Sequence, residues 1–379
     1  MKNKYWINDW AKFRQDEIIR IPKDYKVHSD FTRYINKAAI KSAFEEINSL
    51  YAEIYGDIAK FPEEYGMPLN DKEKYRWYSP EWNYSGQAPY QPFILLYNLF
   101  TCGEIVGNAV KVSIEKYINT IPPPKHLSGI DQKIKKPHIL FSKLASDYGF
   151  VFEGLKNNKP ANADIIISYP DNSTLLILFK MLADKAKNTN RLGDFLCCSF
   201  RLLQDDTHTA KYGDLEYLID NAHTEEEKEF VQKMDKTLMS MNMFRMYSRG
   251  YEGPWLKYYH SKKVMETKGP YTYGIGSRGQ NIFSNLGTEK MILELRIRNV
   301  SSCLDYMKNC PASVKRIFTD KNDNGCGKRN DNTCKHSVAY EIDKKHYWRC
   351  GCCGTAFQVK PKIADIPHYI KLIELGEKK

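Results

Sequence analysis

The sequence predicts an α+β fold with a helical N-terminal domain, a central α+β domain and a small C-terminal domain of β-α-β-β-α order. Three observations lead to this prediction. Apolar residues recur at helical spacing in the first third of the chain, strand-like runs alternate with helical runs after residue 138, and seven of the ten cysteines follow residue 300. We expect the domains to span residues 1–121, 138–248 and 288–379.

The composition is that of a globular protein with a large core. The 379 residues are 42% hydrophobic, and 57 Lys and Arg against 46 Asp and Glu give a formal net charge of +11. A chain of this length buries a core without disulfide bonds, which excludes the disulfide-scaffold class, and its hydrophobic content excludes a disordered chain. The basic balance makes nucleic acid or another anionic partner a candidate.

We expect no secretion signal at the N-terminus. Positive charge follows Met1, but no apolar segment and no small-residue cleavage site come after it. The most apolar stretch, residues 93–100, is too short to cross a hydrocarbon core of about 30 Å, so we expect no membrane association. We therefore expect a cytoplasmic protein, in whose reducing environment clustered cysteines more often bind metal than form disulfides.

The N-terminal domain is expected to contain two long helices. Residues 32–60 carry apolar side chains every three or four positions, as an amphipathic helix does. A second helix is predicted over 92–119, because the proline at its start suits a first helical turn. An aromatic-rich loop, residues 75–92, lies between them, and the proline run at 122–124 begins a linker.

The central domain is expected to combine helices and strands in the order helix, strand, strand, helix, at residues 139–148, 150–152, 163–169 and 171–186. Gly149 is the predicted cap of the first of these helices. A further apolar helical run, residues 194–203, contains Cys197 and Cys198, for which we expect burial. Thr224 and the glutamate three residues later form a capping box that opens another helix.

The C-terminal third begins with an irregular stretch. Residues 249–287 are rich in glycine, tyrosine and lysine without periodicity, and we interpret them as an interdomain region. The predicted C-terminal domain follows as a strand, a helix, a hairpin and a final helix, at residues 291–297, 299–307, 338–359 and 366–375.

Five cysteines and one histidine gather in this domain: Cys326, Cys334, His336, Cys350, Cys352 and Cys353. The segment formed by Cys350, Cys353 and Gly354 resembles the knuckle of zinc-ribbon proteins, in which two thiolates from one tight turn bind the same ion. Zinc takes four tetrahedral ligands, and we predict Cys326 and Cys334 as the second pair. The expected cofactor is a structural Zn²⁺, because four protein ligands leave no coordination position for water.

The second pair departs from the zinc-ribbon pattern of two C-x-x-C knuckles, because seven residues separate Cys326 from Cys334. His336 and Cys352 are therefore alternative ligands, and a site of three cysteines and one histidine also agrees with the sequence. The competing hypothesis is a set of free, partly buried thiols. We prefer the metal site because packing alone does not explain so many cysteines within 28 residues.

Two other patterns carry weaker functional signals. Gly274, Gly276 and Gly279 match G-x-G-x-x-G, but Gly287 prevents a long helix from following, so we reject a dinucleotide site and expect a loop. The aromatic loop is either a stacking platform for a planar ligand or a cover over a helical core. We favour the cover.

The sequence thus predicts a cytosolic zinc-binding protein with a binding or regulatory role. Nucleic acid is one candidate partner, because four basic residues of the central domain suit phosphate contacts: Lys180, Lys185, Lys187 and Arg191. The alternative is an enzyme or small-ligand sensor whose site lies between domains and is lined by the aromatic loop with Trp77 and Tyr78 and by Arg278. The sequence contains no H-E-x-x-H, G-x-S-x-G or P-loop motif, so it assigns no catalytic residue and leaves enzymatic activity open.

Overall fold

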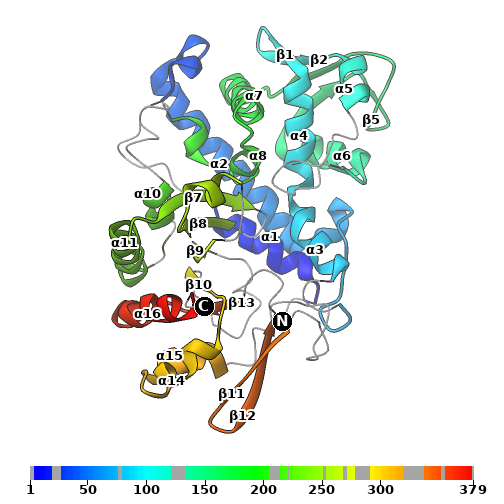
Figure 1. The fold of residues 1–379 in the computed structure, drawn as a ribbon. Helices are drawn as coiled ribbons and strands as arrows, with labels where there is room; N and C mark the ends of the chain where they lie inside the picture. The colour runs from blue at the N-terminus through cyan, green and yellow to red at the C-terminus, as the bar shows by residue number, and fades with distance from the viewer. Residues whose placement is uncertain are drawn as a thin grey trace. The chain divides into compact units, whose positions relative to one another are not determined.

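The computed structural model combines helices with several small sheets, which confirms the α+β class (Figure 1). It describes residues 4–18, 27–75, 79–120, 133–204, 214–220, 222, 224–250, 253–267, 271–277, 291–319, 337–350 and 355–377. The chain divides into two compact units. Unit 1 comprises Met1–Tyr75 with Pro80–Lys211, and unit 2 comprises Arg76–Ser79 with Tyr212–Lys379.

Unit 1 is mainly helical. Its helices are α1 (Trp6–Asp16), η1 (Ser29–Arg33), α2 (Lys37–Lys60), η2 (Pro62–Tyr65), α3 (Pro80–Gln87), η3 (Ala88–Tyr90), α4 (Gln91–Cys102), α5 (Ile114–Thr120), α6 (Pro137–Tyr148), α7 (Ser173–Asn188), α8 (Leu192–Leu196) and η4 (Phe200–Leu202). Tyr51 of α2 stacks on Phe93 of α4 with 3.7 Å between ring centroids, and its hydroxyl donates to the Phe195 carbonyl at 2.8 Å. These contacts join α2, α4 and α8 in one aromatic core. Within the described ranges, no helix of either unit is long and apolar enough to cross a membrane.

A four-stranded antiparallel sheet completes unit 1, in the order β1-β2-β6-β3. Its strands are β1 (Gly103–Val106), β2 (Ala109–Val112), β6 (Ile165–Ser168) and β3 (Val151–Glu153), and β4 (Leu155–Lys156) and β5 (Lys159–Pro160) form a separate ribbon. Val110 and Val112 alternate with exposed neighbours and are fully buried, as are Ile165 and Ile167. Helix α7 contacts β2, so this sheet has one covered face.

Unit 2 is built on a five-stranded antiparallel sheet in the order β13-β10-β9-β8-β7. Its strands are β13 (Thr355–Val359), β10 (Met291–Ile297), β9 (Tyr273–Ser277), β8 (Gly253–Tyr259) and β7 (Phe244–Gly250). A second, two-stranded sheet consists of β11 (Ser337–Ile342) and β12 (Lys345–Cys350). The hairpin β11–β12 is therefore not hydrogen-bonded into the large sheet within the described residues.

Helices cover the sheet of unit 2. They are α10 (Asp214–Asp220), α11 (Glu225–Ser240), α12 (Lys262–Glu266), η5 (Ser301–Cys303), α14 (Leu304–Lys308), α15 (Ala312–Thr319), η6 (Ile363–Asp365) and α16 (Ile366–Gly376). Phe230 of α11 meets Tyr369 of α16 edge to face at 6.5 Å, and both pack in one core with Leu293 and Leu295 of β10. Alternate residues of β10 thus belong to this core, as period two requires.

Several local predictions are confirmed. Helix α2 covers most of the predicted 32–60 helix and begins after Asn36, whose side chain accepts from the Ala38 amide. Gly149 follows α6 with a φ of +72°, the left-handed conformation that suits a glycine cap. Thr224 and Glu227 form the predicted capping box of α11. Each of these features depends on a few neighbouring residues, which explains why the sequence alone predicts it.

The predicted helix over 92–119 is wrong beyond Cys102. Helix α4 ends there, and the chain turns through Gly107 and Asn108 between β1 and β2 before α5 begins. Gly107 has a φ of +59°, as a tight two-residue hairpin requires. Valines at 106, 110 and 112 favour a strand over a helix. The spacing of the apolar residues in this segment also agrees with a helix, which explains the wrong prediction.

The three predicted domains do not coincide with the two units. Residues 138–211, assigned by us to a central domain, fall in unit 1 with the N-terminal helices, and residues 212–248 fall in unit 2. The stretch 249–287 is not an interdomain region in its described part, because β8 and β9 are inner strands of the large sheet. Strand β9 contains glycines and β8 is rich in aromatic residues, so neither segment shows the alternation of apolar and polar residues that predicts a strand.

Candidate functional site

Most of the predicted metal ligands lie outside the described residues: Cys326, Cys334, His336, Cys352 and Cys353. The backbone of Cys350 is described, and it forms the last residue of β12. The structure therefore describes the elements that flank the cluster in sequence, namely α15, the hairpin β11–β12 and strand β13.

The hairpin register pairs the two described residues that flank the halves of the cluster. Cys350 pairs with Ser337 across the antiparallel ladder, and opposite residues in such a ladder have Cα atoms about 4.5–5.5 Å apart. Ser337 directly follows the segment that contains Cys334 and His336, whereas Cys350 directly precedes the segment that contains Cys352 and Cys353. Both segments consequently join the described chain at the same end of one hairpin.

The hairpin is anchored to the core of unit 2. The Tyr340 hydroxyl donates to the carbonyl of Phe318 in α15 at 2.7 Å, and its ring stacks on Tyr347 at 5.8 Å. Phe318 in turn lies 4.6 Å from Phe357 of β13, measured between ring centroids. Arg349, only 2% exposed, places its guanidinium 5.8 Å from the same Phe357 ring. The elements that enter and leave the cysteine segments therefore meet at this aromatic group.

The other two cysteines of unit 2 are ordinary buried thiols. Cys303 donates to the Leu372 carbonyl at 3.3 Å, and burial raises the pKa of this thiol to about 12. Cys310 lies 3.7 Å from Nδ1 of His368, which also lies 2.8 Å from the Tyr306 hydroxyl. Burial raises the pKa of Cys310 as well, so both thiols stay protonated at neutral pH. Within the ranges that the structure describes, no three His, Cys, Asp or Glu side chains gather as metal ligands would.

In its described residues, the aromatic loop belongs to a buried core and does not form a stacking platform. Residues 80–87 are helix α3 and residues 88–90 are η3. Trp82 is fully buried with its ring 5.2 Å from that of Trp10, and Tyr90 is also buried. This agrees with a cover over a helical core. Trp77 and Tyr78, which the enzyme hypothesis needs, lie outside the described residues.

The glycine motif starts in a strand. Gly274 and Gly276 belong to β9, so the expected loop is wrong for this part, while Gly279 and the anion-binding candidate Arg278 lie outside the described residues. A Cβ atom on Gly274 would lie 2.9 Å from the Tyr271 ring and 3.0 Å from the Trp255 ring. The glycine is therefore explained by close packing of aromatic rings on the sheet.

The four basic residues proposed for phosphate contacts are engaged within unit 1 to different extents. Lys180 has a side chain that is only 7% exposed and pairs with Asp184. Arg191 donates to Asp194 at 2.6 Å, and Lys187 donates to the Thr101 carbonyl at 3.2 Å. Phosphate binding by these residues would have to replace contacts with protein groups, which argues against a preformed nucleic-acid surface there.

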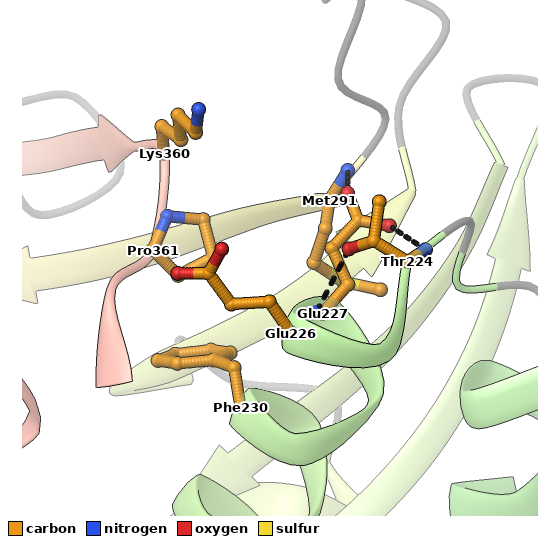
Figure 2. Close-up of a pocket in the computed structure, with 7 residues that line it drawn as sticks. All are labelled: Thr224, Glu226, Glu227, Phe230, Met291, Lys360 and Pro361. Carbon is orange, nitrogen blue, oxygen red and sulfur yellow. Dashed lines mark hydrogen bonds between the residues drawn. The ribbon is translucent and has the colours of Figure 1, made fainter.

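A small pocket lies at the start of α11 in unit 2 (Figure 2). It measures about 100 Å³ and is bounded by Glu226, Phe230 and Pro361, with Lys360 above it. Glu227 also lines this space, and its two carboxylate oxygens accept from the Thr224 and Met291 amides at 3.3 Å each. The pocket is well below the 300 Å³ or so of usual small-molecule sites.

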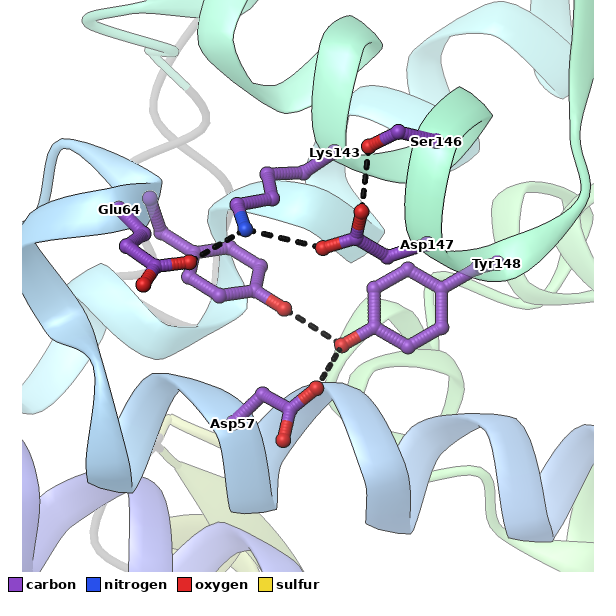
Figure 3. Close-up of polar contacts among 7 residues, drawn as sticks. Asp57, Glu64, Lys143, Ser146, Asp147 and Tyr148 are labelled. Atoms are coloured by element: carbon purple, nitrogen blue, oxygen red, sulfur yellow. Dashed lines mark hydrogen bonds and ion pairs between the residues drawn. The ribbon is translucent and has the colours of Figure 1, made fainter.

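A polar cluster in unit 1 joins α2, η2 and α6 (Figure 3). The Tyr148 hydroxyl donates to Asp57 at 2.7 Å and accepts from the Tyr65 hydroxyl, while Lys143 bridges Asp147, at 2.9 Å, and Glu64. Burial raises the pKa of Tyr65 to about 12 and that of Tyr148 well above its ordinary value. Neutral, mutually bonded tyrosines of this kind fix helix positions and do not form a reactive site.

This cluster leads to a pH-dependent prediction. The unfolded chain ionises Tyr65 from about pH 10, whereas the folded protein keeps it protonated to about pH 12, so its contribution is complete below pH 10 and is lost between these values. Tyr65→Phe should lower the free energy of unfolding of unit 1 by about 1 kcal/mol at pH 7 and weaken the further loss at high pH. Urea unfolding at pH 7, 10 and 11 measures both effects.

Tyr34→Phe is the matched control, since the Tyr34 side chain is 66% exposed. If the free energy of unfolding of Tyr65→Phe fell between pH 10 and pH 11 by as much as that of the wild type, ionisation of Tyr65 would not be the cause of this pH dependence.

Comparison of the sequence with protein-family models, and of the chain with curated proteins and with solved structures, finds no match.

Proposed function

We propose that this chain is a zinc-binding protein with a binding or regulatory role, in which Cys326, Cys334, Cys350 and Cys353 hold one structural Zn²⁺ in unit 2. The observation that supports it is the pairing of Ser337 with Cys350. The chain enters and leaves this ladder at these two residues, so the cysteine-bearing segments on either side of the hairpin begin from paired positions. Two pairs of thiolates that approach from two chain segments meet the tetrahedral requirement of zinc.

A structural role fits the surroundings better than a catalytic one. Four thiolates close the coordination sphere, and the adjoining hairpin is packed on aromatic side chains through Tyr340 and Arg349. Zinc held in this way contributes free energy of folding to the region around it. The region then presents a fixed surface, which is the property that a binding or regulatory protein requires.

The first test is the metal content of the full chain. Protein purified under reducing conditions from zinc-supplemented cells should carry about one zinc ion per chain by native mass spectrometry, and Cys350→Ser should reduce or abolish it. Cys102→Ser is the matched control, because Cys102 is a half-buried cysteine of unit 1. Wild-type protein without metal would contradict the proposal and would direct attention to a disulfide between Cys326 and Cys353.

A second measurement decides between the alternative ligands. Cobalt(II) exchanged into the site reports the number of thiolates through its charge-transfer absorption, so Cys334→Ser should remove one thiolate contribution. His336→Gln and Cys352→Ser should leave the spectrum unchanged if the four cysteines named above are the ligands. A change in His336→Gln would instead identify the site of three cysteines and one histidine.

A further inference from the structure

The first strand of unit 1 has an unpaired edge. Strand β1 is terminal in the sheet, and within the described ranges its only strand partner is β2. An unpaired edge offers backbone N–H and C=O groups to another extended chain. The strand has no proline, so nothing in its own sequence removes a donor from that edge.

The register identifies which backbone groups face outward. Val106 and Ala109 flank the two-residue turn and form its closing hydrogen-bonded pair. Bonded and non-bonded pairs alternate along an antiparallel ladder, so the next pair, Ile105 with Val110, is not hydrogen-bonded. The N–H and C=O of Ile105 therefore point away from β2.

A groove lies beside this strand, and Gly103, Glu104 and Ile105 of β1 line it. The groove has a volume of about 390 Å³ and lies between β1, helix α7 and the η1 segment. Its apolar lining includes Phe31, which is buried, and Ile105 and Met181, which are half-buried. Tyr34 stands at the rim with 66% of its surface exposed, although large apolar or aromatic side chains are usually covered.

The charges of the groove exclude a strongly charged occupant. Three acidic and three basic side chains line it: Asp30, Glu104, Asp184, Arg33, Lys180 and Lys185. Asp184 pairs with Lys180, Arg33 lies 3.6 Å from Asp30, and Glu104 lies 2.9 Å from Lys116 outside the groove. A lining without net charge gives no attraction to polyphosphate, whereas the main chain of an extended peptide is itself neutral.

We propose that this groove binds an extended peptide segment of a partner protein, which adds to β1 as a further strand. The peptide exchanges hydrogen bonds with the backbone of Ile105, places one side chain between Phe31 and Met181, and packs an adjacent residue against Tyr34. A strand edge beside a helix is a common arrangement for such recognition, and the volume falls within the usual 300–1,000 Å³ or so of binding sites. The site is independent of the zinc proposal, because every residue of it belongs to unit 1.

The test uses the full chain and a phage-displayed library of random octapeptides, with the enriched sequences synthesised as capped peptides. Ile105→Pro removes the outward N–H while leaving the bonds to β2, since that amide is not part of the ladder. Affinity should fall about tenfold, which corresponds to roughly 1.4 kcal/mol and lies at the upper end of what one hydrogen bond contributes. Ile105→Val keeps the amide but shortens a side chain that lines the groove, so it should lose clearly less affinity than Ile105→Pro.

Hydrogen exchange supplies a direct readout at the edge. The Ile105 amide should exchange freely in the unbound protein and be protected at least about tenfold when the peptide is bound. Affinity should also change little between low and moderate salt, because the groove has no net charge. If Ile105→Pro fails to fold, Tyr34→Ala is the second variant, and it should weaken binding severalfold.

Three results would overturn the proposal. The first is a library that enriches no peptide on the wild type beyond the level found with Ile105→Pro. The second is equal affinity for the wild type and both the Ile105→Pro and Tyr34→Ala variants. The third is an Ile105 amide already protected in the free protein, which would mean that the edge is occupied by this chain itself or, if protection is lost on dilution, by a second copy.

Discussion

Replacing Arg14 by methionine is expected to lower the free energy of unfolding of unit 1 by about 3–5 kcal/mol, the cost of breaking a buried ion pair by removing one partner. The Arg14 side chain is fully buried, and its Nη1 donates to Oε2 of Glu17 at 2.7 Å. Glu17 is only 3% exposed, so methionine at position 14 would leave a carboxylate without its cation in the interior of unit 1.

The contacts of Arg14 reach beyond its own helix. Nη2 donates to the Gly86 carbonyl at 3.1 Å, and the guanidinium lies 4.5 Å from the Tyr90 ring and 5.0 Å from the Trp10 ring. Burial by itself would lower the pKa of Arg14, but the negative potential of Tyr90 and Glu17 raises it above its ordinary value. One charged group therefore connects α1, α3 and η3, and its removal affects all three.

The measurement is urea unfolding combined with hydrogen exchange of peptides from α1, because the chain has two units and a single transition need not report on unit 1 alone. Arg33→Met is the matched control. The Arg33 side chain is 74% exposed and 3.6 Å from Asp30, and its replacement should change stability by less than about 0.5 kcal/mol.

A double variant separates the ion pair from simple packing. Arg14→Met combined with Glu17→Met removes both charges and should recover a substantial part of the stability lost in the single variant, since apolar replacements of a buried pair are often neutral. If Arg14→Met costs no more than Arg33→Met, or if the double variant is as unstable as the sum of the two single ones, the buried pair does not have the role described here.

Elements with local signals were the ones that the sequence predicted well. Helix α6 has its glycine cap and lies within a few residues of the predicted bounds, and α11 begins directly after the predicted capping residue Thr224. The hairpin predicted over 338–359 is correct only for β11 and β12. Strand β13 pairs with β10 in the five-stranded sheet instead. Pairing between strands that are distant in sequence depends on the tertiary fold, which spacing along the chain does not report.

The edge at β1 was missed although its sequence signal is local. Residues 103–112 were assigned to a helix, although Gly107-Asn108 between short valine-rich runs is a hairpin signal. The signal that could have identified it is this dipeptide, but the groove beside it also requires α7 and η1, which are far away in sequence. The cysteine cluster, in contrast, was visible from spacing alone, because its residues fall within one short segment.

Removal of the proposed zinc ion should destabilise unit 2 and leave unit 1 unchanged. The hairpin β11–β12 is a separate two-stranded sheet, and two strands alone are marginally stable in water. Its described contacts to the core include the bond from Tyr340 to Phe318, the ring contacts of Tyr340 and Arg349 with Phe357, and the apolar packing of Val338, Ile342 and Tyr347. A metal ion at the Ser337–Cys350 end would supply the closure that these contacts do not.

The expected loss for the hairpin is at least about 3 kcal/mol, a modest share of the roughly 10–16 kcal/mol that structural zinc contributes in zinc-finger peptides. The measurement is hydrogen exchange of peptides from 337–350 and from α2, before and after a zinc chelator under reducing conditions, with metal removal verified by mass spectrometry. Exchange should accelerate in the hairpin and remain constant in α2, and restoring zinc should reverse it. Unchanged exchange in verified zinc-free protein would mean that Tyr340 and its aromatic neighbours suffice to hold the hairpin, and that the cysteine cluster has no structural role.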